Sequence, residues 1–364
     1  MAEKNRTMGA RRVTRRGFLL AFSAGAATTM LAGCGGGMTA TVAPTTAPSR
    51  APTAAATGAA TRVASSVGGG PSSGGPNASA TRTASLIAAT PARQISVAVT
   101  TTHLQDFLKN VGGERLTISG ILKPNVDPHD YETSVQDAQA IGRAEIIFVY
   151  GLGLDAFMDK PIANANSKAP IITVTRGIAP LAGGTKDPYG DPHMWFDPTL
   201  VQKMVTDIGE ALAQLDPPSA AFYRQNVQGY NAQIARMDTR VQGIYNQIPA
   251  ADRKLVTNHE AFQYLANRFS LNIVGAVIPS LSDAAEPTAQ DINDLIGTIR
   301  AQKVKAIFAE SSANPRVARQ VAQETGITIV DNLYGDTLGE PGSDGDTYLK
   351  MMVADATTIV TALK

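Results

Sequence analysis

Three of the four histidines in this 364-residue chain lie in short motifs that could supply metal ligands. They are His129 in VDPHDYE, His193 in GDPHMWFDP and His259 in TNHEAF, and a carboxylate, Asp336, follows in YGDTLGE. The histidines come at the ends of segments predicted to be strands, where an open α/β sheet places its ligand site. Several imidazoles with one carboxylate suit a divalent transition metal such as zinc. The pattern predicts a metal-binding site without catalytic residues.

Taken singly, each of these histidines is more often a hydrogen-bonded loop residue than a ligand. Two of them share a context, because His129 and His193 both follow an Asp-Pro pair that stiffens the preceding loop. A preorganised loop is what a binding site without catalytic demands would use. The fourth histidine, His103 in TTTHLQ, matches no ligand motif, and we expect it to have a structural role at the start of a helix.

Acidic residues crowd the region of Asp336 and leave its assignment open. The others are Asp331, Glu340, Asp344 and Asp346. Most acidic residues in such a region are solvated loop or cap groups, and Asp346 is expected to cap the last helix. Glu310 ends another predicted strand and could support the site from behind.

The elements that must position these residues alternate between strands and helices in two halves. Strands are predicted in the first half at residues 95–101, 116–122, 145–151 and 171–175, and in the second at 254–259, 271–278, 306–312 and 327–333. Alternating βα units predict an α/β fold of mostly parallel sheets with helices on both faces, which explains why the strands are almost entirely apolar. Between the halves, residues 218–247 repeat apolar positions at intervals of three to five and predict one long helix.

The N-terminus predicts export and a membrane anchor. Residues 11–16 are rich in arginine, and a weakly apolar stretch follows that is shorter than the roughly 20 residues of a membrane-spanning helix. The stretch ends in LAG before Cys34, the only cysteine, which resembles a bacterial lipoprotein box. Lipidation of Cys34 would hold the protein at a membrane surface.

Residues 34–94 then form a predicted disordered tether of Ala, Thr, Ser, Gly and Pro, too poor in apolar surface to fold. The first 94 residues hold ten of the 32 basic residues and one of the 31 acidic residues, so the rest has a net charge of about −8. That charge argues against nucleic acid as a partner, since phosphate binding needs a basic face, and it favours a cation.

The four motifs, in this order, resemble the metal-binding substrate proteins of bacterial ABC importers, the zinc and manganese group. The resemblance covers about residues 95–364. It implies an extracytoplasmic monomer with two lobes joined by a rigid helix, which holds a metal ion between the lobes and passes it to an ABC permease. The ligands would be His129 and His193 from the first lobe, and His259 and Asp336 from the second. The expected limits are 1–33 for the export signal, 34–94 for the lipidated cysteine and tether, 95–217 and 249–364 for the lobes, and 218–248 for the helix.

Both the identity of the metal and the functional class of the protein have alternatives. Members of this group carry histidine or glutamate at the position of His259, and histidine there favours Zn²⁺ over Mn²⁺ because it is neutral and softer. Manganese remains the alternative, because the segment of Asp336 and Asp346 resembles manganese members as well. A zinc hydrolase is disfavoured because Gln263 stands where the HExxH motif needs its second histidine. An adhesin-type lipoprotein that has lost its ligands is disfavoured because all four are present.

Overall fold

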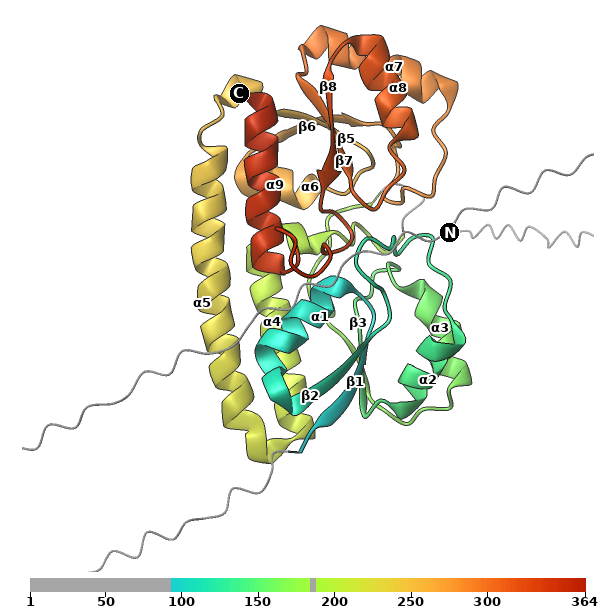
Figure 1. Ribbon diagram of the computed structural model, residues 1–364, viewed down its shortest axis with the longest axis vertical. Helices are drawn as coiled ribbons and strands as arrows, with labels where there is room; N and C mark the ends of the chain where they lie inside the picture. The colour runs from blue at the N-terminus through green and yellow to red at the C-terminus, as the bar shows by residue number, and fades with distance from the viewer. Residues whose placement is uncertain (1–92, 184–187) are drawn as a thin grey trace, which may run out of the picture. The chain divides into compact units, whose positions relative to one another are not determined.

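The structure is a computed structural model that describes residues 93–183 and 188–364. The predicted export signal, Cys34 and nearly all of the tether lie outside the described residues. Figure 1 shows two α/β lobes, the first with β1 to β4 and the second with β5 to β8, and a long helix, α5, that runs beside both. The predicted α/β class with two parallel sheets is confirmed. Within the described residues, no helix is both long and apolar enough to span a membrane.

The first lobe is built on a parallel sheet with the strand order β2-β1-β3-β4. Its strands, in that order, are Leu116–Gly120, Ile95–Val99, Ile146–Val149 and Ile171–Thr173. Helices α1 (Thr102–Gly112) and α4 (Pro198–Leu215) cover one face, and α2 (Val135–Arg143) and α3 (Asp159–Asn164) cover the other. Side chains alternate between the faces, so Val97 and Val99 belong to one hydrophobic cluster and Ala98 to another.

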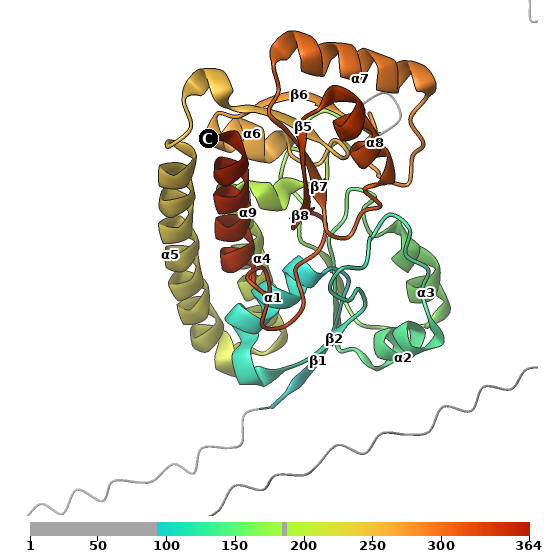
Figure 2. The same cartoon turned by 45° about the horizontal axis from the view of Figure 1, so that its top comes forward.

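The second lobe repeats this plan with the order β6-β5-β7-β8, again all parallel. Its strands, in that order, are Asn272–Ala276, Lys254–Thr257, Ala306–Glu310 and Thr328–Leu333. One face carries α7 (Ala289–Gln302) and α8 (Arg316–Thr325), and the other carries α6 (Gln263–Phe269) and α9 (Tyr348–Leu363). Figure 2 shows both pairs of helices against the sheet.

Helix α5 (Ala220–Tyr245) follows a short 3₁₀ turn at Pro217–Ser219 and lies within the interval predicted for it. Its 26 residues give a length of roughly 39 Å at 1.5 Å per residue. The buried side chains form one stripe along the helix: Tyr223, Val227, Tyr230, Ile234, Met237, Val241 and Tyr245. This stripe packs against α4 of the first lobe and α9 of the second, so α5 supports both lobes.

One buried carboxyl group links helices from different parts of the chain. Asp106 Oδ2 on α1 accepts hydrogen bonds from the Tyr230 hydroxyl on α5, at 2.9 Å, and from the backbone N–H of Tyr348 on α9, at 3.1 Å. Burial raises the pKa of Asp106, and the two hydrogen bonds oppose that shift. The first lobe, the long helix and the second lobe therefore meet at this side chain.

Candidate metal centre

The four predicted ligands come from four loops, only two of which directly follow a strand. His259 lies two residues after β5, and Asp336 lies three residues after β8. His129 and His193 lie farther along, nine residues after β2 and twenty after β4. The expectation that all three histidines sit at strand ends is therefore wrong for two of them. Hydrogen bonds within both loops hold these two histidines.

Each of these two loops contains an aspartate that fixes the backbone of its histidine. Asp127 Oδ1 accepts a hydrogen bond from the His129 N–H at 2.7 Å, and Asp191 Oδ1 accepts one from the His193 N–H at 2.9 Å. Aspartate commonly bonds its own backbone two residues ahead in this way. The stiffening predicted for the Asp-Pro pair thus has a physical cause, because the aspartate carboxylate hydrogen-bonds to the backbone of the histidine.

The side chains of His129, His193, His259 and Asp336 meet in one cluster, in which one donor atom from each lies within 4.8 Å of the others. Asp336 Oδ2 lies 3.3 Å from His129 Nε2 and 3.5 Å from His259 Nε2, and Asp336 Oδ1 lies 3.4 Å from His193 Nε2. The two Nε2 atoms of His193 and His259 are 3.4 Å apart.

These spacings match the edges of a small coordination tetrahedron. Zinc binds nitrogen and oxygen at about 2.0–2.1 Å, which places tetrahedral ligands roughly 3.3–3.4 Å apart. Four contacts within the cluster, at 3.3–3.5 Å, lie close to that value. The cluster therefore has about the size of a site that holds one four-coordinate metal ion.

Two of the imidazoles are oriented by carboxylates behind them. His193 Nδ1 lies 2.7 Å from Asp191 Oδ1, and His259 Nδ1 lies 3.1 Å from Glu310 Oε1. Both carboxylates are almost completely buried. Such a partner fixes the ring and leaves Nε2 free to bind a metal. Glu310 therefore contacts the site as anticipated, whereas the contact from Asp191 to the ring was missed and is signalled only by its place two residues before His193.

The electrostatics of the cluster favour protonated imidazoles beside an ionised carboxylate when no metal is bound. Burial opposes the charge on His193, but Asp336 and Asp191 outweigh it and raise the pKa of His193 to about 10. Burial likewise opposes protonation of His259, while Glu310 and Asp336 raise its pKa. Burial alone would raise the pKa of Asp336, yet His259 and His193 hold it well below its usual range. A binding cation must therefore displace protons.

The loop that carries Asp336 is fastened to the first lobe. The Leu338 N–H donates to Thr102 Oγ1 at 2.8 Å, and Thr337 Oγ1 accepts from the Asn125 N–H at 2.8 Å. Both bonds lie within two residues of Asp336. They join a ligand of the second lobe to the lobe that carries His129 and His193.

Other acidic residues of this region have partners elsewhere. Asp331 contacts Arg319, Asp344 accepts from the Tyr334 hydroxyl, and Asp346 accepts from Lys350 Nζ and does not touch the cluster. The predicted helix cap at Asp346 is wrong by one residue, because the Thr347 side chain accepts from the Lys350 N–H and caps α9. Asp336 is the acid that faces the histidines.

His103 lies outside the cluster, as expected for a structural residue. Its ring is fully buried and stacks on Trp195, with the ring centroids 4.7 Å apart and the planes at 18°. Burial lowers the pKa of His103 to about 3, so this imidazole stays neutral. Its packing helps to fill the first lobe beneath the 3₁₀ turn Met194–Phe196 that follows His193.

Two further features bear on alternative sites. Residues 258–262 form a turn that precedes α6, so His259 and Glu260 do not lie on a helix, whereas an HExxH zinc protease requires them to.

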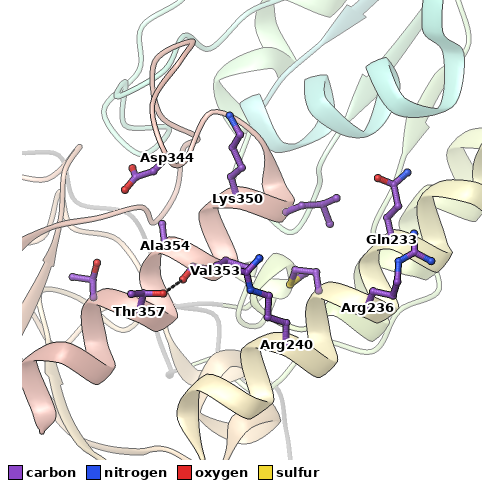
Figure 3. A pocket seen from close by; sticks show the side chains of 11 residues that line it. Gln233, Arg236, Arg240, Asp344, Lys350, Val353, Ala354 and Thr357 are labelled. Atoms are coloured by element: carbon purple, nitrogen blue, oxygen red, sulfur yellow. Dashed lines mark hydrogen bonds between the residues drawn. The ribbon is translucent and has the colours of Figure 1, made fainter. Parts of the chain in front are cut away.

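A surface cavity of about 730 Å³ lies between α5 and α9 and is shown in Figure 3. It is lined by Arg236, Arg240 and Val353 among others, and it contains none of the four cluster residues.

The fold and the cluster define a two-lobed protein with a three-histidine, one-aspartate site buried between its lobes. The family model of "Zinc-uptake complex component A periplasmic" matches residues 97–362. The chain belongs to that family.

Relatives and solved structures agree with this assignment. The zinc-binding protein TroA of Treponema pallidum is 30% identical over 274 residues, which cover 73% of this chain and 88% of TroA. The manganese ABC transporter substrate-binding lipoprotein PsaA of Streptococcus anginosus is 28% identical over 72% of this chain and 87% of PsaA. A solved structure of the periplasmic zinc-binding protein TroA superposes with a TM-score of 0.69 at 28% identity and covers 74% of this chain and 99% of TroA.

Proposed function

We propose that this protein captures a divalent transition metal, with zinc preferred, and delivers it to an ABC permease. The observation that carries the proposal is the cluster of His129, His193, His259 and Asp336, in which four donor contacts of 3.3–3.5 Å are close to the ligand spacing of a zinc tetrahedron. The metal is cargo in this proposal, and the protein is not an enzyme. Four protein ligands leave no open position for an activated water.

Manganese is the second candidate, supported by the PsaA relative, which is named for manganese. Three neutral imidazoles with one carboxylate form a softer donor set than manganese prefers, and this favours zinc. The relatives named as lipoproteins also support an extracytoplasmic location with a lipid on Cys34 as the anchor. We propose that the protein acts as a monomer and does not bind nucleic acid.

The deciding experiment measures the metal bound to the full chain. Protein purified without added metal is analysed for metal content, stripped with a chelator, and titrated with zinc and manganese separately and in competition. We expect one ion per chain and tighter binding of zinc. Binding of several ions with equal affinity would contradict a single site, and a preference for manganese would select the second candidate.

A second measurement separates transport from catalysis. The zinc-loaded protein is assayed with peptide, ester and phosphate substrates, and we expect no turnover. Zinc-dependent hydrolysis that disappears in His259→Ala would overturn the binding-protein proposal.

A further inference from the structure

The three histidine rings of the cluster differ in their contacts with carboxylates and in their exposure to solvent. The rings of His193 and His259 each face a buried carboxylate, with nitrogen–oxygen distances of 2.7 Å and 3.1 Å. The ring of His129 contacts Asp336 within the cluster, and among residues 93–183 and 188–364 no carboxylate outside the cluster pairs with it. Its side chain is also 11% exposed, whereas Asp336 is 3% exposed and the other two rings are almost fully buried. His129 is thus the most exposed of the three rings and the one without a carboxylate behind it.

A cavity of about 270 Å³, which we term the His129 cavity, is lined by His129. Its walls come from both lobes: Leu152, Gly153, Leu154 and Ala156, then Pro188, Tyr189, Gly190 and Pro192, and Leu281 with Ser282. Since one water occupies roughly 30 Å³ in the liquid, the cavity can admit an ion that still carries several waters. Four other cavities in the described part of the chain are lined by none of the four cluster residues.

The other sides of the cluster are closed by contacts that would have to break. His193 packs against the ring of Trp195, with centroids 5.3 Å apart, and is fully buried. The loop of Asp336 is fastened to the first lobe through Thr102 and Asn125. An ion that approached from those sides would need the lobes to separate, whereas an ion in the His129 cavity needs only rotation of one partly exposed ring.

We propose, on the basis of the metal-binding function proposed above, that the ion enters and leaves through the His129 cavity. His129 binds an incoming ion first and hands it to the three fixed ligands, and it is the last to release a departing ion. The same passage serves both directions. An obstruction in the cavity therefore slows association and dissociation by the same factor and leaves the dissociation constant unchanged.

The test places an obstruction in the cavity after folding, through a thiol. Cys34 is the only cysteine, so a full chain with Cys34→Ser and Ser282→Cys carries one reactive thiol at the cavity wall. The folded, metal-loaded protein is treated with maleimides of increasing size, and its zinc association and dissociation rates are measured by stopped flow before and after labelling. We expect both rates to fall about tenfold or more with the largest label, while the dissociation constant changes by less than about twofold.

The control variant carries Cys34→Ser and Thr357→Cys. Thr357 is exposed in the cavity between α5 and α9 of Figure 3, so the same labels should leave both rates unchanged there. Rates that are unaffected by the label at position 282, or a change in only one of them, would overturn the proposed passage. Failure of the unlabelled protein to bind metal at all would instead refute the proposed function.

Discussion

His193 Nδ1 lies 2.7 Å from Oδ1 of Asp191, and the same oxygen accepts the backbone N–H of His193. One carboxylate therefore fixes both the position of the residue and the direction of its ring. Because Nδ1 is engaged, Nε2 faces Asp336 and His259. The cluster owes much of its shape to a residue that does not contact the ion.

Removing this support should weaken metal binding without unfolding the protein. We expect Asp191→Ala to lower zinc affinity by about 10- to 100-fold, the usual cost of losing a partner behind a ligand. Asp191→Asn retains an oxygen that can accept a hydrogen bond from the His193 ring, so its zinc affinity should fall less. Asp207→Asn, at an exposed position on α4, is the matched control. Titration calorimetry measures the affinities. An unchanged zinc affinity in Asp191→Ala would show that the His193 ring is positioned without the contact to Asp191.

The choice of metal should depend on His259. Glutamate at this position adds charge and a harder oxygen, which suits manganese better than zinc. His259→Glu should therefore lower zinc affinity and narrow or reverse the preference for zinc over manganese. The comparison variant is His103→Ala, which removes a histidine that lies outside the cluster and should alter the selectivity little. Unchanged selectivity in His259→Glu would remove this residue from the ligand set.

Zinc binding should release protons and strengthen as the pH rises. An unperturbed histidine competes with metal only below about pH 6.5. Nearby carboxylates raise the pKa of His193 to about 10, so this residue is protonated in the metal-free protein at neutral pH, and they also raise the pKa of His259, so protons compete with the metal there more strongly than at a free histidine. Affinity should therefore fall as pH decreases from about 9 through the neutral range. Calorimetry in buffers of different ionisation enthalpy counts the protons, and zero release at pH 7 would contradict the assigned charges.

The membrane anchor is tested separately from the site. Cys34→Ser should release the protein from the membrane fraction, because no lipid can then be attached at this position. Metal affinity should not change, since all four cluster residues lie beyond residue 128. Fractionation followed by immunoblotting measures the distribution. A serine variant that still partitions with membranes would exclude lipidation of Cys34 as the anchor.

The sequence predicted the sheets well because the strands of a parallel sheet are buried on both faces. Ile146, Ile147 and Phe148 show this, since all three are apolar although successive side chains point to opposite sides. The regular spacing of Val227, Tyr230 and Ile234 likewise predicted α5.

Contacts between distant loops were not predictable in the same way. Leu338 donates to Thr102 across 236 positions, and nothing in either local sequence signals this bond. Glu310 was expected to support the site, but its contact with His259 in particular depends on β5 and β7 lying side by side. Periodicity predicts an element, but pairs such as these require the assembled fold.

Asp106 has a consequence for how cargo is captured. If the lobes opened widely about α5, the buried carboxyl group of Asp106 would lose its hydrogen bond from the Tyr230 hydroxyl or from the Tyr348 N–H. Leaving a buried polar group without its partner costs about 1–3 kcal/mol. Wide opening is therefore opposed at the place where the two lobes meet the long helix. The overall conformation of the protein should therefore differ little between the metal-free and metal-bound forms. A permease would have to distinguish the two forms by local differences in loops and side chains.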